Sequence, residues 1–74
     1  MTNREFAQKN KDFIDSCEAA GVAPTKRQAS KYRRGMGSAA KVSRELLAKY
    51  RKWRREFDDG EITESWEEWR NEHL

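Results

Sequence analysis

The sequence contains one cysteine, one proline and one histidine in 74 residues. Because Cys17 has no partner, an internal disulfide and a cysteine metal cage are excluded, and a reducing compartment is favoured. His73 lacks companion ligands at the spacing of a metal site, and no acid and nucleophile accompany it at a catalytic spacing. We therefore expect a protein that is not an enzyme and that needs no cofactor and no metal.

Long apolar runs are also lacking. No stretch approaches the roughly 18 apolar residues that a membrane-spanning helix needs. The opening MTNREFAQKNKD has no apolar segment of the kind found in secretory signals. We therefore expect no membrane partner and a location in the cytoplasm. The length predicts a single domain over residues 1–74, which we expect to be monomeric.

Apolar residues make up only 35% of the chain, whereas 39% of it is charged. The three Phe, three Trp and two Tyr residues nevertheless supply large apolar groups, so the composition favours folding over disorder. No segment alternates apolar and polar residues as a strand does, and the apolar residues recur at helical spacing. We therefore predict an all-α fold.

Three capping boxes define where helices are expected to begin. Thr2, Thr25 and Ser65 are each followed three residues later by Glu or Gln, which is typical of a helix start. Gly35–Met36–Gly37 predicts a turn, and Ser38 is the expected cap of the helix that follows it. The resulting prediction is a domain of about four helices, at about 3–20, 26–34, 39–58 and 64–72.

The apolar faces of these helices define the expected core. When successive residues advance by about 100° around a helix, the large apolar residues fall together on one side. Cys17 lies on such a face, so we interpret it as a small core residue and not as a nucleophile. Stacking on nucleic-acid bases is an alternative role for the tryptophans, but their helical spacing matches packing in the core better. The predicted core comprises Phe6, Phe13, Ile14, Val42, Leu46, Tyr50, Trp53, Phe57, Trp66 and Trp69.

The net charge of +3 conceals an uneven distribution along the chain. Residues 1–24 carry three basic and four acidic side chains, a net charge of −1. Residues 25–57 carry twelve basic and two acidic side chains, a net charge of +10, and residues 58–74 carry one basic and seven acidic side chains, a net charge of −6. Such asymmetry between segments is typical of proteins with charged partners.

The basic residues of the central segment form the candidate binding surface. On a helix over 39–58, five of them gather on the side opposite the apolar face, namely Lys41, Arg44, Arg51, Lys52 and Arg55. Like charges four residues apart, such as Arg51 and Arg55, weaken an isolated helix, so folding alone does not explain them. An anionic partner would explain them, and the alternative is a solvated face whose long side chains cover apolar neighbours. The candidate partner-binding residues are Arg27, Lys31, Arg33, Arg34, Lys41, Arg44, Arg51, Lys52 and Arg55.

The succession of a short helix, a glycine turn and a longer helix has the outline of a helix-turn-helix. The longer predicted helix, of about 20 residues, exceeds the usual recognition helix, and 38–57 contains no Asn or Gln for reading base edges. If this surface meets nucleic acid, phosphate contact is favoured over sequence recognition. One candidate function is therefore direct, non-sequence-specific nucleic-acid binding through the basic 25–55 surface.

The segment Thr25–Ala39 fits the pattern T-x-R-Q-A-x-K-[YF]-R-x-x-x-G-x-A, which covers about a fifth of the chain. This pattern resembles that of small bacteriophage proteins, among them the RNA-polymerase-binding regulators of the kind encoded by lytic Xanthomonas phages. The resemblance implies a protein that binds host RNA polymerase in the infected cytoplasm. Such a protein inhibits initiation or suppresses termination by occupying polymerase contacts, for example those between core enzyme and sigma factor. A structural or packaging protein of the phage particle is a further alternative.

Overall fold

The computed structural model describes residues 1–74, and its regular structure consists of helices alone. The predicted all-α fold is therefore confirmed, but the chain forms six helices where about four were expected. Two of the expected long helices are each divided in two. The helices are α1 (Asn3–Lys9), α2 (Lys11–Ala20), α3 (Lys26–Arg33), α4 (Gly37–Ala40), α5 (Arg44–Asp58) and α6 (Trp66–His73).

The predicted helix over 3–20 is interrupted at Asn10. Asn10 has an extended backbone (φ −80°, ψ 108°) and serves both as the last cap of α1 and as the first cap of α2. Its side-chain oxygen accepts a hydrogen bond from the Phe13 N–H at 2.9 Å. A short polar side chain that bonds to nearby backbone competes with continued helix, which accounts for the break.

The predicted helix over 39–58 is interrupted at Lys41–Val42–Ser43. Ser43 is extended (φ −72°, ψ 159°), and its hydroxyl accepts a hydrogen bond from the Leu46 N–H at 3.1 Å. Ser43 therefore begins α5, whereas the expected cap Ser38 lies inside the short helix α4. The prediction for Ser38 is wrong, because Met36 occupies the first cap position of α4 and makes no side-chain bond there.

The three predicted capping residues are confirmed at their positions. Thr2, Thr25 and Ser65 accept hydrogen bonds from the third backbone N–H after them, at 3.1–3.2 Å. The turn at Gly35–Met36–Gly37 is confirmed as well, since Gly35 and Gly37 have φ values of 74° and 85°. A side chain strains such a backbone conformation, which glycine adopts freely.

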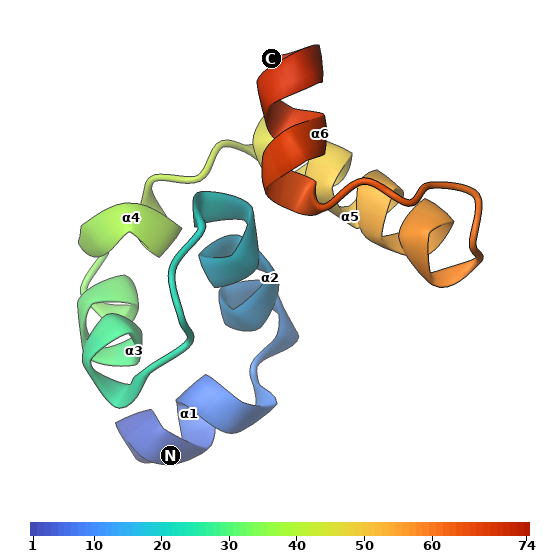
Figure 1. Ribbon diagram of the computed structural model, residues 1–74. Coiled ribbons are helices and arrows are strands. Elements are labelled where there is room, and N and C mark those ends of the chain that lie inside the picture. The colour runs from blue at the N-terminus through green and yellow to red at the C-terminus, as the bar shows by residue number, and fades with distance from the viewer.

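Helices α1 to α4 surround one group of apolar side chains, which we call the N-terminal cluster. Figure 1 shows α1, α3 and α4 arranged around α2. Phe13 and Cys17 of α2 are fully buried, and the rings of Phe6, Phe13 and Tyr32 lie 5.2–5.9 Å apart. The buried members of this cluster are Ala7, Phe13, Cys17, Ala29 and Ala39.

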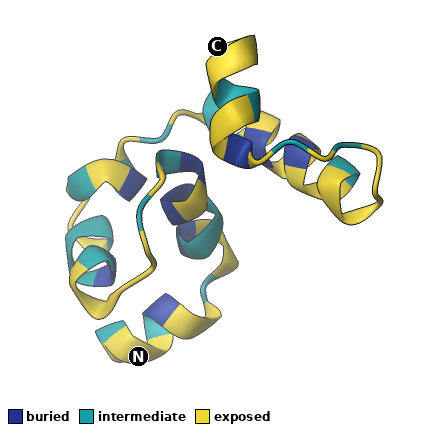
Figure 2. Ribbon diagram, in the orientation of Figure 1, coloured by how far each residue is buried: buried dark blue, intermediate teal, exposed yellow.

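Helices α5 and α6 pack around a second group, the C-terminal cluster. Its buried members are Ala19, Tyr50, Trp53 and Trp66, and Figure 2 shows buried residues on facing sides of these helices. Because α2 supplies Phe13 and Cys17 to one cluster and Ala19 to the other, this helix connects the two. The molecule is accordingly elongated, with extents of 37 × 22 × 16 Å.

The predicted core is confirmed in part. Phe13, Tyr50, Trp53 and Trp66 are buried, and Phe6, Ile14, Val42, Leu46 and Trp69 are partly buried against the two clusters. Phe57 is 39% exposed, so its assignment to the core is wrong. It lies at the far end of α5, where its ring stacks on Trp53 with centroids 5.0 Å apart.

Candidate docking surface

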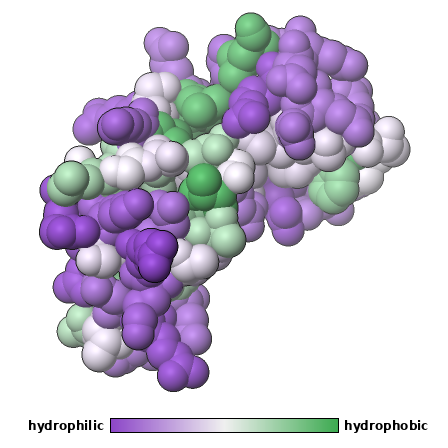
Figure 3. Space-filling model, turned by 60° about the vertical axis from the view of Figure 1, so that its left-hand side comes forward, coloured by the Kyte–Doolittle hydropathy of each residue, from purple (hydrophilic) through white to green (hydrophobic).

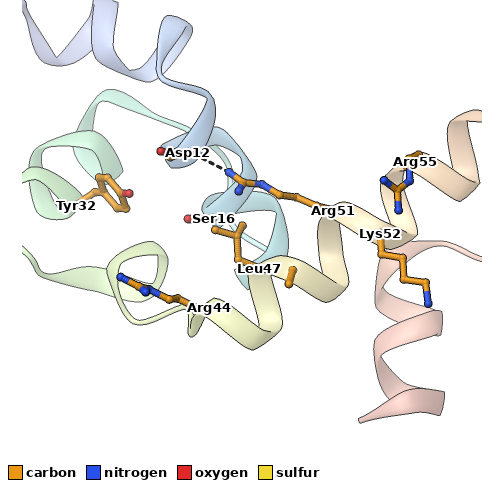
Figure 4. A pocket seen from close by; sticks show the side chains of 9 residues that line it. Asp12, Ser16, Tyr32, Arg44, Leu47, Arg51, Lys52 and Arg55 are labelled. Atoms are coloured by element: carbon orange, nitrogen blue, oxygen red, sulfur yellow. Dashed lines mark hydrogen bonds and ion pairs between the residues drawn. The ribbon is translucent and has the colours of Figure 1, made fainter.

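Four of the predicted basic residues line an open groove of about 770 Å³ beside α5. They are Arg44, Arg51, Lys52 and Arg55, and Figure 4 shows their side chains along the helix. Arg44, Arg51 and Arg55 are seven and four residues apart and therefore lie on one side of the helix, with Lys52 at the edge of that side. The sequence-based grouping of these four side chains is therefore matched by the structure.

The rest of the groove wall comes from other helices and from apolar residues of α5. Tyr32 of α3 and Leu47 of α5 face the groove, and Asp12 and Ser16 of α2 complete it. Sequence reasoning did not assign any of these residues to the surface. Their proximity depends on how α2, α3 and α5 pack, which local periodicity does not specify.

Arg51 differs from the other basic residues of the groove because its charge is paired within the chain. Its guanidinium donates to Asp12 at 2.6 Å and to Asp15 at 3.0 Å. The hydrogen bond to Asp12, followed by that to Asp15, raises the pKa of Arg51 above its usual value. Arg51 therefore fastens α5 to α2 and leaves less free charge for a partner.

Arg44, Lys52 and Arg55 form no ion pair within the chain. The ion pairs of the molecule are the two of Arg51 and a third between Arg54 and Asp58, at 3.4 Å. The acidic segment 58–74 thus forms an ion pair with Arg54 and with none of the groove residues. Three positive charges beside an aromatic and an aliphatic side chain remain open to a partner.

A second basic surface lies on α3, which we call the α3 patch. It is a shallow depression of about 350 Å³ lined by Lys26, Arg27, Lys31 and Arg34, together with Asn3 and Ser30. Three of these basic residues were predicted to bind a partner, and Lys26 was not among them. Its position next to Arg27 in a first helical turn was the signal available in the sequence.

The remaining two predicted residues line neither surface. Arg33 donates to the Met1 carbonyl at 3.0 Å and to Asn3 at 3.1 Å, and its guanidinium lies 5.1 Å from the centre of the Phe6 ring. This residue therefore ties the start of α1 to α3. Lys41 is exposed between α4 and α5, and the break in the predicted helix separates it from the α5 stripe.

Outside these surfaces the structure offers few groups for chemistry. Burial, followed by the nearby Glu18, raises the pKa of the Cys17 thiol to about 11. His73 is exposed at the end of α6, where its ring stacks on Trp69. No group of three His, Cys, Asp or Glu residues is placed to hold a metal ion. None of the helices combines the length and apolar character needed to cross a membrane.

The exterior in Figure 3 is mostly hydrophilic, with small hydrophobic areas between the polar ones. Comparison with known proteins finds no matching family, no matching curated protein and no matching solved structure. A proposed function therefore rests on the fold, on the two basic surfaces and on the resemblance of Thr25–Ala39 to small phage proteins.

Proposed function

We propose that this chain is a non-enzymatic binding protein that docks on host RNA polymerase and regulates transcription by occupying contacts of the polymerase. The observation that carries the proposal is the groove along α5, where Arg44, Lys52 and Arg55 have no partner in the chain. The choice of polymerase rests on the resemblance of Thr25–Ala39 to small phage regulators.

The composition of the groove favours a protein partner. Arginine and tyrosine are enriched at protein interfaces, where apolar contacts accompany charged ones. The groove combines Arg44 and Arg55 with Tyr32 and Leu47, and it contains one carboxylate, Asp12. Because Asp12 is paired with Arg51, the feature that favours a protein partner is the mixture of unpaired cations with an aromatic and an aliphatic side chain.

The acidic segment 58–74 gives the molecule an opposite electrical pole. Its net charge is −6, and α6 carries Glu67, Glu68 and Glu72 on exposed positions. Complementary charges increase the rate of encounter and fix the orientation of docking. A chain with a basic groove and an acidic end would approach a polymerase surface in one preferred orientation.

The proposal is tested by capture of proteins from a nuclease-treated bacterial lysate at moderate salt, followed by mass spectrometry. Nuclease treatment removes nucleic acid that would otherwise bridge the chain to polymerase. We expect retention of polymerase subunits by the native chain and their loss with the triple variant Arg44→Gln, Lys52→Gln, Arg55→Gln. Absence of polymerase subunits from the captured material would refute the proposal.

A further inference from the structure

We infer that the α3 patch binds the phosphate backbone of nucleic acid, as a second activity separate from polymerase docking. The patch brings Lys26, Arg27, Lys31 and Arg34 into one depression. None of these four residues forms an ion pair within the chain. The inference does not rest on the proposed function, because it concerns other residues and needs no polymerase.

The α3 patch and the α5 groove lie on different sides of α3. Arg27, Lys31 and Arg34 are four and three residues apart and share one helical face. Tyr32, the α3 residue that lines the groove, projects roughly 130° away from the centre of that face at about 100° per residue. The two surfaces can therefore hold different partners at the same time.

The chemistry of the patch matches phosphate and little else. Its lining contains no hydrophobic residue and no carboxylate. The centre of a protein interface is usually apolar, and a membrane-binding surface inserts apolar side chains, so the patch fits neither of these partners. Flexible cations beside the Ser30 hydroxyl are the groups that contact phosphate oxygens.

The patch has little means of reading sequence. Asn3 is the only amide that lines it, and the Asn3 side-chain oxygen already accepts a hydrogen bond from Arg33 at 3.1 Å. The charged side chains of the patch are arginines and lysines. On a shallow surface these side chains contact the phosphate backbone of a nucleic acid before its base edges. We therefore assign a contact that depends on charge and salt and not on base sequence.

Folding alone does not favour this arrangement of charge. Lys26 and Arg27 occupy the first turn of α3, which contains no acidic residue. The helix dipole makes this end positive, so cations are unfavourable there. A bound phosphate backbone would remove that repulsion, which a solvated surface would leave in place.

The test is fluorescence anisotropy of short labelled duplex DNA, single-stranded DNA and RNA, titrated with the purified chain over a range of salt. One variant carries Lys26→Gln, Arg27→Gln and Arg34→Gln, and all three of these side chains are exposed. The matched control carries Arg44→Gln, Lys52→Gln and Arg55→Gln. Each variant replaces one lysine and two arginines, so both lose the same charge, and circular dichroism checks that both remain helical.

We expect the patch variant to bind at least tenfold more weakly than the native chain, and the groove variant to stay within threefold. The slope of log affinity against log salt should fall by roughly 2–3 in the patch variant, because each lost phosphate contact removes about 0.9. Equal losses in both variants would overturn the inference, as would an absence of binding by the native chain at low salt. Either result would leave the capture of polymerase unaffected.

Discussion

The indole of Trp66 donates a hydrogen bond to the carbonyl of Ala19 at 3.0 Å, and this bond attaches α6 to the end of α2. The same carbonyl accepts a second bond from Arg70 at 3.2 Å. Because Ala19 lies in the last turn of α2, its carbonyl lacks a helical partner, and both donors satisfy it. The acidic C-terminal helix is thus fixed to the helix that connects the two clusters.

The Trp66 contact predicts a specific loss of stability. Trp66→Phe keeps most of the apolar contact but removes the indole N–H, so we expect unfolding to become easier by about 1–2 kcal/mol. Trp69→Phe is the matched control, because Trp69 is partly buried and its indole N–H makes no hydrogen bond in the structure. Urea denaturation followed by circular dichroism measures both. Equal losses in the two variants would contradict a special role for the Ala19 bond.

The pairing of Arg51 with Asp15 predicts a measurable coupling between α5 and α2. The Asp15 side chain is 13% exposed, whereas Asp12 is 73% exposed, so the Asp15 contact is the less screened one. We expect a coupling of about 0.5–1 kcal/mol between Arg51→Gln and Asp15→Asn in a double-mutant cycle. The cycle with Asp12→Asn should give a smaller value. A larger coupling for Asp12 would mean that burial does not decide the strength of these pairs.

The turn before α4 predicts unequal effects of alanine at its two glycines. Both Gly35→Ala and Gly37→Ala place a side chain at positive φ, which costs roughly 1–2 kcal/mol. At Gly37 the added Cβ would also lie 3.2 Å from Cβ of Lys31, whereas nothing lies within 4 Å at Gly35. We therefore expect a lower thermal midpoint for Gly37→Ala than for Gly35→Ala. The reverse order would show that the packing of α4 on α3 is different from that described.

The buried thiol of Cys17 predicts a dependence of stability on alkaline pH. Its pKa is raised from 9.0 to about 11 in the folded chain, by burial and then by Glu18. The protonated thiol therefore contributes its full stabilisation of the folded chain below about pH 9, where it is protonated in both states. This stabilisation declines between pH 9 and about 11, where only the unfolded thiol ionises.

The measurement for Cys17 compares the native chain with Cys17→Ala. For each chain, the midpoints of urea denaturation at pH 8 and at pH 10 give the change in stability between these two pH values. All other ionisable groups are the same in the two chains, so their effect cancels in the comparison. We expect a larger decline for the native chain, and an equal decline would show that the thiol does not resist ionisation.

Local chemistry made much of the fold predictable. Thr2, Thr25 and Ser65 carry caps that depend on residues three positions away, and these were found from sequence. The breaks at Asn10 and Ser43 were missed, although both residues are good helix caps. The apolar repeat continues past each break, so periodicity alone predicts one long helix even where a polar side chain competes locally for the backbone.

The candidate site was predictable only where it follows one helix. Arg44, Lys52 and Arg55 share a side of α5 because of helical periodicity. The pairing of Arg51 with Asp12 joins residues 39 positions apart, so no local pattern indicates it. The position of Tyr32 in the groove likewise depends on the packing of α3 near α5. The exposure of Phe57 follows from its place at the end of α5, beyond the reach of α6.

Docking on RNA polymerase through the α5 groove is tested by the affinity of the purified chain for purified bacterial RNA polymerase, measured with three proteins. These are the native chain, the groove variant (Arg44, Lys52 and Arg55 to Gln) and the patch variant (Lys26, Arg27 and Arg34 to Gln). We predict binding by the native chain, at least a tenfold loss of affinity in the groove variant and less than a threefold change in the patch variant. Undetectable binding by the native chain, or equal losses in the two variants, would contradict this prediction.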